Sequence, residues 1–277
     1  MTSGFHEGEL EVQKLAGVAH DAARLQGMLR PPLLDGGAAK FLSQREFAAI
    51  TARDRDGLLW TSPLQGPAGF LEAKGTTLTV HATPPKGDPL HELPADQEVG
   101  LIVIEFAIRR RVRVNGHLTT ATDVLRIDAD QAYGNCPQYI DPEHRPPAAA
   151  STESVVTDGE LGEVQAALIE AADTFFLGTT HPGRGVDTSH KGGTPGFVRI
   201  DGPDLWWPDY AGNNMFNSLG NIAVDPTTAL LFIDFATGTT LHLTGTATID
   251  WNAPPDESGT GRRVRFHPTR THLDLRA

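Results

Sequence analysis

A polar segment in the second half of the chain combines a hydroxyl, an imidazole and an ammonium group with two glycines. It reads DTSHKGG, so that Ser189, His190 and Lys191 are followed by Gly192 and Gly193. Glycines let backbone N–H groups approach a ligand, and a hydroxyl beside an ammonium group suits a phosphate monoester. The same letters are also typical of an exposed turn, and this alternative stays open on the segment alone.

The first half of the chain repeats this pattern without the basic residues. Phe70 matches Phe197 at an offset of 127, and Glu105 matches Asp234 at an offset of 129. A two-residue insertion reconciles the offsets, which predicts a tandem duplication. At the positions of the Ser-His-Lys triplet the first copy has Ser62, Pro63 and Leu64. We therefore expect phosphate chemistry mainly in the second copy.

A second group of candidate ligands follows an aromatic strand in WWPDYAGNNMFNSLGN. The candidates are Asn213, Asn214, Asn217 and Ser218. Amides and hydroxyls at the start of a helix can donate to a phosphate or to a ring carbonyl. An ordinary Asn-rich cap and turn is the alternative, and the sequence alone favours it. The nearest stretch of the first copy has Asp88 followed by a proline, an acid that would repel phosphate and a residue without an N–H donor.

The only basic cluster of the sequence is IRRRVRVNG. In a strand, side chains alternate between faces, so Arg109, Arg111 and Arg113 share one face and Arg110 lies on the other. Solvation on a barrel exterior is the favoured interpretation for most of them. The functional alternative is that Arg111 faces an interface and contacts a bound anion. Cys136, in YGNCPQYI, has no cation or base adjoining it in sequence, which favours a structural role over a reactive thiol.

The elements that must position these residues are mainly strands. A helical pattern runs from Glu7 to about Leu29, a short helix is expected near residues 44–49, and Asp54–Gly57 reads as a hairpin turn. Strand-like runs then follow at the spacing of a β-barrel. The series begins again after a Pro/Ala/Ser-rich linker and a second helix for which Asp158 is the expected N-cap. We expect two β-barrels, residues 1–145 with the N-terminal helix and residues 146–277 with the main phosphate site.

Composition narrows the class of protein. The chain has 277 residues and a formal net charge of −12, which argues against nucleic acid as a partner because phosphate backbones require a basic surface. A single cysteine, the lack of a signal-peptide pattern and the lack of a long apolar run predict a cytoplasmic protein without membrane contact. The eleven histidines lack ligand spacing, so no metal site is predicted.

These segments together resemble the pyridoxamine 5′-phosphate oxidase-like, FMN-binding split-barrel family, in its tandem flavin-nucleotide-binding subgroup. The motifs that carry the resemblance are FHEGELEVQKLAG, GPAGFL, GNCPQYI, ADTFFLGTTHP, DTSHKGGTPGFVRI, DYAGNNMFNSLGN and PTTALLFIDF. The resemblance implies a mainly β protein with peripheral helices, in which two tandem split β-barrels form a pseudo-dimer and FMN lies in the groove between them. F420 or FAD could replace FMN. By position, the implied cofactor-binding residues are Ser189, His190, Lys191, Asn213, Asn214, Asn217, Ser218 and Arg111.

The function implied by this resemblance is that of an FMN-dependent oxidoreductase acting on a small-molecule substrate or electron acceptor. The sequence identifies neither the substrate nor a catalytic residue. A non-catalytic flavin or haem carrier or sensor is the main alternative, and an interaction scaffold without a cofactor is the second. The tandem chain could also pair again as a homodimer.

Overall fold

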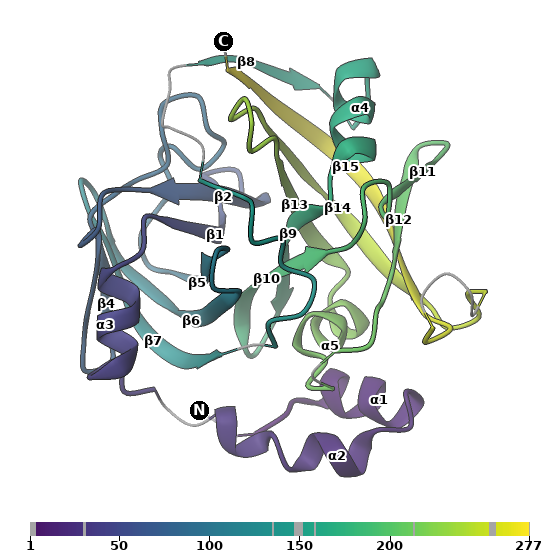
Figure 1. Cartoon of the computed structure of the whole chain (residues 1–277), viewed down its shortest axis with the longest axis horizontal. Coiled ribbons are helices and arrows are strands. Elements are labelled where there is room, and N and C mark those ends of the chain that lie inside the picture. Colours follow the sequence, from purple (N-terminus) through teal and green to yellow (C-terminus); the bar gives the residue numbers. More distant parts are fainter. Residues whose placement is uncertain are drawn as a thin grey trace.

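The computed structural model describes residues 4–29, 32–134, 136–146, 152–157, 159–212, 214–254 and 259–276. Its first half forms a seven-stranded antiparallel sheet with the strand order β2-β1-β5-β6-β7-β4-β3 (Figure 1). The strands are β1 (Phe47–Arg53), β2 (Leu59–Gln65), β3 (Leu71–Lys74), β4 (Thr77–Val80), β5 (Gln97–Glu105), β6 (Arg110–Ala121) and β7 (Leu125–Gly134).

The second half repeats this arrangement. The order β10-β9-β13-β14-β15-β12-β11 is that of the first sheet with each strand replaced by its counterpart, and β8 (Thr152–Thr157) adds to β15. The strands are β9 (Thr174–His181), β10 (Gly185–Gly192), β11 (Arg199–Asp201), β12 (Asp204–Pro208), β13 (Thr227–Ile233), β14 (Thr240–Asp250) and β15 (Arg263–Arg276). Each half thus has its own split barrel.

The two sheets have an irregularity in strand register at equivalent positions. The ladder between β6 and β7 shifts at Asn115/Gly116, and the ladder between β14 and β15 shifts at Thr244/Gly245. A Cβ on either glycine would lie within 2.2 Å of a carbonyl oxygen of the neighbouring strand. Because β-bulges are specific local features, their recurrence at equivalent positions fits a tandem duplication.

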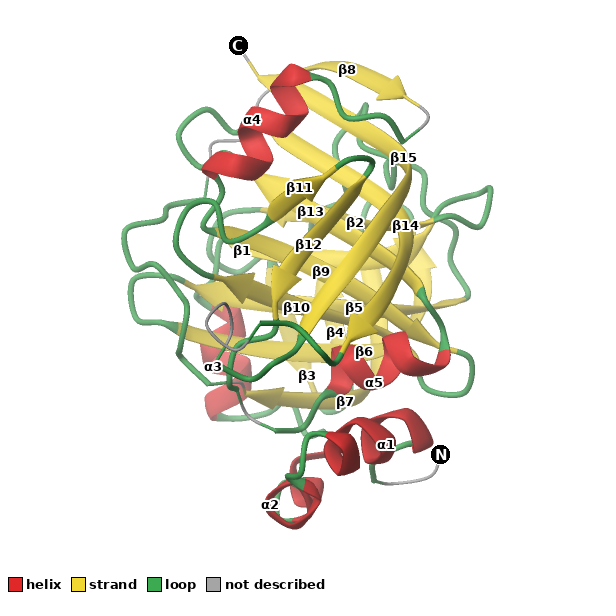
Figure 2. Ribbon diagram, turned by 90° about the vertical axis from the view of Figure 1, so that its right-hand side faces the viewer, coloured by secondary structure: helices red, strands yellow, loops and turns green. Residues whose placement is uncertain are grey.

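The barrels pack side by side through strands that are buried on both faces. β1 alternates Ala48 and Ile50, which lie in the core of the first barrel, with Phe47 and Ala49, which contact the other half. Phe176 on β9 lies 5.5 Å from Phe47 in this shared cluster. Since neither face meets water there, the central part of each strand is apolar on both faces, as at residues 47–50 of β1 and 175–177 of β9. Strand β10 lies against β5 and β13 lies against β2, so strands of the two sheets meet directly in the middle of the molecule, where Figure 2 labels them.

Close approach of the two backbones makes one interface glycine necessary. A Cβ on Gly100 would lie 2.7 Å from the backbone nitrogen of Thr188 in the other half. Next to it, the hydroxyl of Thr188 donates to the carbonyl of Gly100 at 2.7 Å, which links β10 to β5 across the interface. The halves therefore form one tightly packed pseudo-dimer.

The helices differ in part from the expectation. The single helix expected over 7–29 is interrupted at Gly17, which has φ of 73°. The helix expected near residues 44–49 is wrong, because β1 already begins at Phe47. The second expected helix is present as α4, with Gly162 as its N-cap, whereas Asp158, the expected N-cap, lies outside the described residues. The helices are α1 (Glu7–Leu15), α2 (Ala19–Ala23), a 3-10 turn (Gln26–Leu29), α3 (Gly37–Ser43), α4 (Glu163–Ala171) and α5 (Asn217–Val224).

Helix α1 packs against α5 of the second half, as Figures 1 and 2 both show. The contact is so close that a Cβ on Gly8 would lie 2.2 Å from the carbonyl oxygen of Gly220. The N-terminal segment of the chain thus supports the helix of the second barrel, while the domain division at residue 145 stays a prediction. In the described part of the chain, every helix is too short or too polar to cross a bilayer.

Candidate functional site

A pocket opens between the two halves, where β6 of the first barrel meets β10, β12 and the start of α5 of the second. Its cavity volume is about 120 Å³. Of the predicted site residues it brings together Arg111, His190, Lys191, Asn214, Asn217 and Ser218, while Asn213 lies outside the described residues.

The arginines of β6 lie as the period-two pattern predicts, with one exception. Arg111 and Arg113 both line the pocket, and Arg110 lies on the other face with its guanidinium 4.7 Å from the ring of Phe41. Arg109 instead lies in the turn before the strand, with φ of 51°. Two guanidinium groups of the first half therefore face the second half.

Arg113 is neutralised by a carboxylate of the second half. Its guanidinium donates to Asp187 at 2.8 Å, and the same carboxylate accepts from the amide of Asn115 at 3.0 Å. The hydroxyl of Tyr133 lies 3.4 Å from Asp187, and burial raises the pKa of this phenol, so it stays a neutral donor. This buried group fixes the two halves relative to each other and adds no net charge to the pocket.

Arg111 has no such counterion among the described residues. It contacts the imidazole of His190, 2.6 Å from Nδ1, and donates to the carbonyl oxygen of Cys136 at 2.8 Å. Both partners are neutral, and its Nε is buried without a partner. Burial, together with the charge of Arg113, lowers the pKa of Arg111 to about 10. A buried cation without a counterion favours binding of an anion.

Lys191 contributes a second cation to the pocket. Within the described part of the chain, the structure gives its ammonium group neither a hydrogen bond nor an ion pair. Burial lowers the pKa of Lys191. The negative charge of Asp209 has the largest effect in the opposite direction. That carboxylate is already paired with Arg262 at 3.0 Å. The pocket therefore holds two positive charges that the protein does not balance by direct contact.

The predicted serine and histidine take different roles. Ser189 is fully buried and lies outside the pocket wall, where its hydroxyl accepts from that of Ser218 at 3.1 Å. His190 packs between the rings of Phe106 and Phe176. Burial and the charge of Arg111 lower its pKa well below the ordinary value, so the ring is neutral. Because Nδ1 accepts from Arg111, the proton lies on Nε2, which is buried and has no partner.

The start of α5 reaches the pocket with its backbone rather than its polar side chains. Phe216, the N-cap, is left-handed with φ of 61° and provides no side-chain cap. The first N–H groups of a helix have no partner within it and carry partial positive charge. The side chain of Asn217 is turned toward Glu9, and that of Ser218 toward Asp187 and Ser189.

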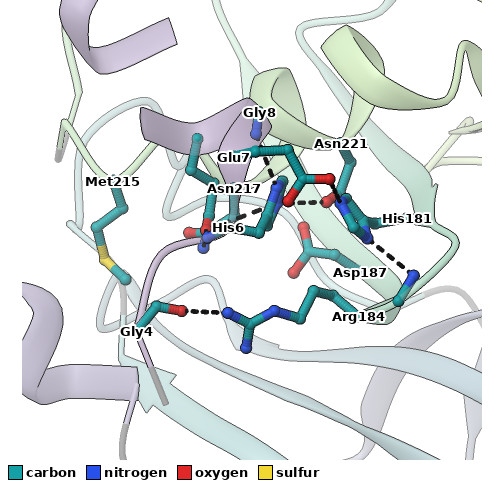
Figure 3. A network of polar contacts seen from close by, with 12 residues as sticks. Gly4, His6, Glu7, Gly8, His181, Arg184, Asp187, Met215, Asn217 and Asn221 are labelled. Carbon is teal, nitrogen blue, oxygen red and sulfur yellow. Dashed lines mark hydrogen bonds and ion pairs between the residues drawn. The ribbon is translucent and has the colours of Figure 1, made fainter. Parts of the chain in front are cut away.

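A network behind the pocket holds α5 in place (Figure 3). Glu9 on α1 accepts from Asn217 and from the backbone N–H of His6. Nε2 of His6 donates to Asn221 at 3.1 Å. Burial raises the pKa of Glu9 to about 7 and lowers that of His6 to about 4, so both groups tend toward their neutral forms. The N-terminal motif thus positions the helix that forms the pocket wall.

The GNCPQY motif, to which the sequence assigns no role, covers the pocket. Cys136 and Tyr139 line it, and the ring of Tyr139 stacks on that of Tyr210 at 5.2 Å. The strand below must approach this segment closely, because a Cβ on Gly192 would lie 2.0 Å from the carbonyl oxygen of Tyr139. Asn135 lies outside the described residues.

The equivalent positions of the first copy are built differently. The hydroxyl of Ser62 donates to Asp88 at 2.6 Å, and Leu64 belongs to the core of the first barrel with 1% exposure. The contact between Ser62 and Asp88 corresponds to that between Ser189 and Ser218. An acid therefore stands where the second copy has a hydroxyl.

No family model and no curated protein sequence matches the chain. Several solved structures are similar to parts of it. They include HupZ from Group A Streptococcus (14% identity, 43% of this chain and 96% of that one, TM-score 0.35) and the FAD binding protein from Mycobacterium smegmatis (13%, 42% and 98%, 0.30). A third is a Clostridium acetobutylicum protein of the pyridoxinephosphate oxidase family, related to general stress protein 26 (13%, 39% and 84%, 0.29).

These similarities are too slight to transfer a function, and the description of the fold rests on the strand order of the chain itself. The solved structures include proteins of the kind that the sequence motifs resemble, and each covers about two fifths of this chain.

Proposed function

We propose that the chain binds a flavin nucleotide, FMN, in the pocket between its two barrels and uses it to oxidise or reduce a small molecule. The observation that carries this proposal is the pair of half-buried cations, Arg111 and Lys191, in one pocket, neither of which contacts a carboxylate of the described residues. Leaving charges buried and unpaired costs several kcal/mol, and a phosphate would offset this cost.

The local geometry favours a terminal phosphate monoester. Two cations match its two negative charges, and the uncapped start of α5 adds N–H donors beside them. FAD and F420 carry phosphates within longer chains as diesters, each with one negative charge. FMN ends in the monoester, and it is therefore the flavin nucleotide that fits this set of donors best.

The remaining wall suits the rest of such a ligand. Trp207, Phe197 and the stacked pair Tyr139 and Tyr210 surround the cationic end with aromatic surface. Planar apolar rings pack well against such surface. The isoalloxazine ring would extend toward the open side of the pocket, past the two tyrosines.

A bound flavin supplies the hydride or electron transfer, and the protein binds and orients it. In this chain Arg111 and Lys191 would hold the phosphate, and neutral His190 would keep the guanidinium of Arg111 directed at it. Among the described residues that line the pocket, the geometry marks no pair of groups as acid and base for a particular substrate. The substrate is therefore stated only as a small molecule that reaches the open side.

The test begins with the absorption spectrum of the purified protein. About one flavin per chain is expected, either as isolated or after titration with FMN. Reduction by nicotinamide nucleotides and reoxidation by added acceptors would then separate an oxidoreductase from a non-catalytic carrier. A Soret band instead of flavin absorbance would favour the haem alternative, and failure to bind either cofactor would contradict the proposal.

A further inference from the structure

The pseudo-symmetric counterpart of the flavin pocket contains a cluster of opposite charge. On β14, His242 pairs with Leu231, and on β6 Arg113 pairs with Ile102. Leu231 follows Ile102 by 129 positions, and His242 follows Arg113 by the same number. His242 is therefore the counterpart of Arg113. Asp88, which contacts Ser62 as Ser218 contacts Ser189, adds a carboxylate on the same side.

The cluster consists of Asp88, His242 and Asp274. Nε2 of His242 lies 3.8 Å from Oδ2 of Asp88 and 3.7 Å from Oδ2 of Asp274. The three ligand atoms all lie within 4.8 Å of one another, and the residues are 5%, 0% and 4% exposed. They come from the loop after β4, from β14 and from β15, so the cluster joins the first half to the second.

The hydrogen bond made by Nδ1 of His242 shows which of its two ring nitrogens carries the proton. Nδ1 lies 2.8 Å from the carbonyl oxygen of Thr61, which can only accept, so Nδ1 carries a proton. In the neutral ring, the lone pair of Nε2 then faces the two carboxylates, which in their charged form cannot donate to it, and the hydroxyl of Thr240, which can either donate to it or bind a metal. An Nδ1–H bonded to a backbone carbonyl is also the usual support of a metal-binding histidine.

The carboxylates are oriented in the same way. Oδ1 of Asp88 accepts from the hydroxyl of Ser62 at 2.6 Å and from the N–H of Leu90 at 2.7 Å. Oδ1 of Asp274 lies 3.0 Å from Nε2 of His272. Each carboxylate thus has Oδ1 held by donors and Oδ2 on the side of His242. The hydroxyl of Thr240, 3.0 Å from the same imidazole nitrogen, adds an oxygen beside them.

We propose that Asp88, His242 and Asp274 bind a divalent metal ion, Zn²⁺, with the hydroxyl of Thr240 available as a fourth ligand. In tetrahedral zinc sites with bonds of about 2.0–2.2 Å, neighbouring ligand atoms lie roughly 3.3–3.6 Å apart. The separations of 3.7 and 3.8 Å need only a small contraction. The ion would balance both carboxylates, and its burial indicates a structural role in joining the halves.

A second histidine cluster does not share this geometry. In the group formed by His6, Glu7 and His181, all four imidazole nitrogens are engaged. His6 accepts from the N–H of Gly8 and donates to Asn221, while His181 accepts from the N–H of Gly183 and contacts Glu7. There both lone pairs are held by fixed backbone N–H groups, whereas the lone pair of His242 meets a hydroxyl that can turn and bind the metal itself.

The test is the metal content of the full chain, produced without a histidine tag in zinc-supplemented medium. We expect one Zn²⁺ per chain by elemental mass spectrometry, and none in Asp88→Asn or His242→Gln. The control His144→Gln removes a half-buried histidine 2.7 Å from Asp173 in a different cluster and should retain the metal. Metal lost from this control but retained by the first two variants would overturn the assignment.

Thermal unfolding gives a second, independent readout. Chelation should lower the Tm of the wild-type protein by roughly 5–10 °C, and added ZnCl₂ should restore it. Asp88→Asn, whose fold is checked by circular dichroism, should respond to neither treatment. A folded wild-type protein that contains no metal and does not bind added Zn²⁺ at one per chain would refute the proposal.

Discussion

Replacing Arg111 by glutamine should change cofactor binding and stability in opposite directions. In the free protein its guanidinium is a buried charge without a counterion, and burial lowers its pKa to about 10. Relative to the ordinary value near 12.5, this corresponds to a penalty of about 3 kcal/mol on the charged form. The substitution removes that penalty.

The substitution also removes the contacts to His190 and to the carbonyl of Cys136. A hydrogen bond contributes about 1 kcal/mol, so the two losses offset most of the gain. We expect Arg111→Gln without cofactor to be more stable by about 1 kcal/mol, a rise in Tm of roughly 2–4 °C. The FMN affinity should fall, because a hydrogen bond to a charged group contributes about 1.5–3 kcal/mol, or about 10- to 150-fold in Kd.

Thermal melts of the cofactor-free proteins and titration of flavin fluorescence measure the two effects. Arg110→Gln is the matched control, since Arg110 is exposed on the other face of the same strand; it should leave FMN affinity unchanged and, because it loses a contact with the ring of Phe41, should lower stability slightly rather than raise it. An FMN affinity unchanged in Arg111→Gln would refute the placement of the phosphate. A loss of several kcal/mol in stability would show instead that the guanidinium is structural.

Lys191→Ala should weaken FMN binding about 10-fold or more in the same titration, because it removes a charge from the phosphate end, and unchanged affinity would remove this residue from the site. Leu64→Ala, at the equivalent position of the first copy, should leave FMN binding unchanged but cost about 2–5 kcal/mol in urea unfolding, since its side chain is buried in the barrel core. Gly192→Ala should weaken binding by displacing the segment that carries Tyr139, because the new Cβ would clash with its carbonyl oxygen; wild-type affinity would show that the segment adjusts freely. Burial raises the pKa of Glu9 to about 7, so the native state keeps a proton that the unfolded chain releases, and this contribution to stability is lost as the pH rises from about 4.5 to 7. The free energy of unfolding of Glu9→Gln relative to wild type should therefore increase over that range, and a constant difference would contradict the shift.

The fold was largely predictable from the sequence because its repeat can be recognised residue by residue. The offsets of 127 and 129 correspond to the register of the paired strands, in which Ala49 lies opposite Pro63 and Phe176 lies opposite His190. Helix boundaries were predicted less well. The helix expected near residues 44–49 is absent there, because α3 already ends at Ser43 and Phe47 begins β1, where pairing within the sheet overrides the local helical pattern.

The candidate site was predictable in part. The period of two along β6 led to Arg111, and the Ser-His-Lys triplet led to His190 and Lys191, all of which meet in one pocket. The direction of the polar side chains at α5 could not be predicted, because it depends on Glu9, more than 200 positions away. The counterion role of Asp187 is hidden from the sequence for the same reason.

The cluster of Asp88, His242 and Asp274 could not be predicted from the sequence either. Histidine spacing along the chain gave no sign of a metal site, since His242 meets Asp88 and Asp274 only after the two halves pack together. Ligands from three separate segments leave no local motif. The one available signal was the acid at Asp88, near the position that Asn217 holds in the second copy.

The central claim, that the pocket between the barrels binds the phosphate of a flavin nucleotide, is tested most directly by comparing FMN with riboflavin. The two ligands share the ring and the sugar chain and differ only in the phosphate. We predict that FMN binds at least about 100-fold more tightly to the wild-type protein, because two charge-assisted contacts are made only with FMN. The difference should largely vanish in the double variant Arg111→Gln/Lys191→Ala. Equal affinities of the wild-type protein for FMN and riboflavin would contradict the account.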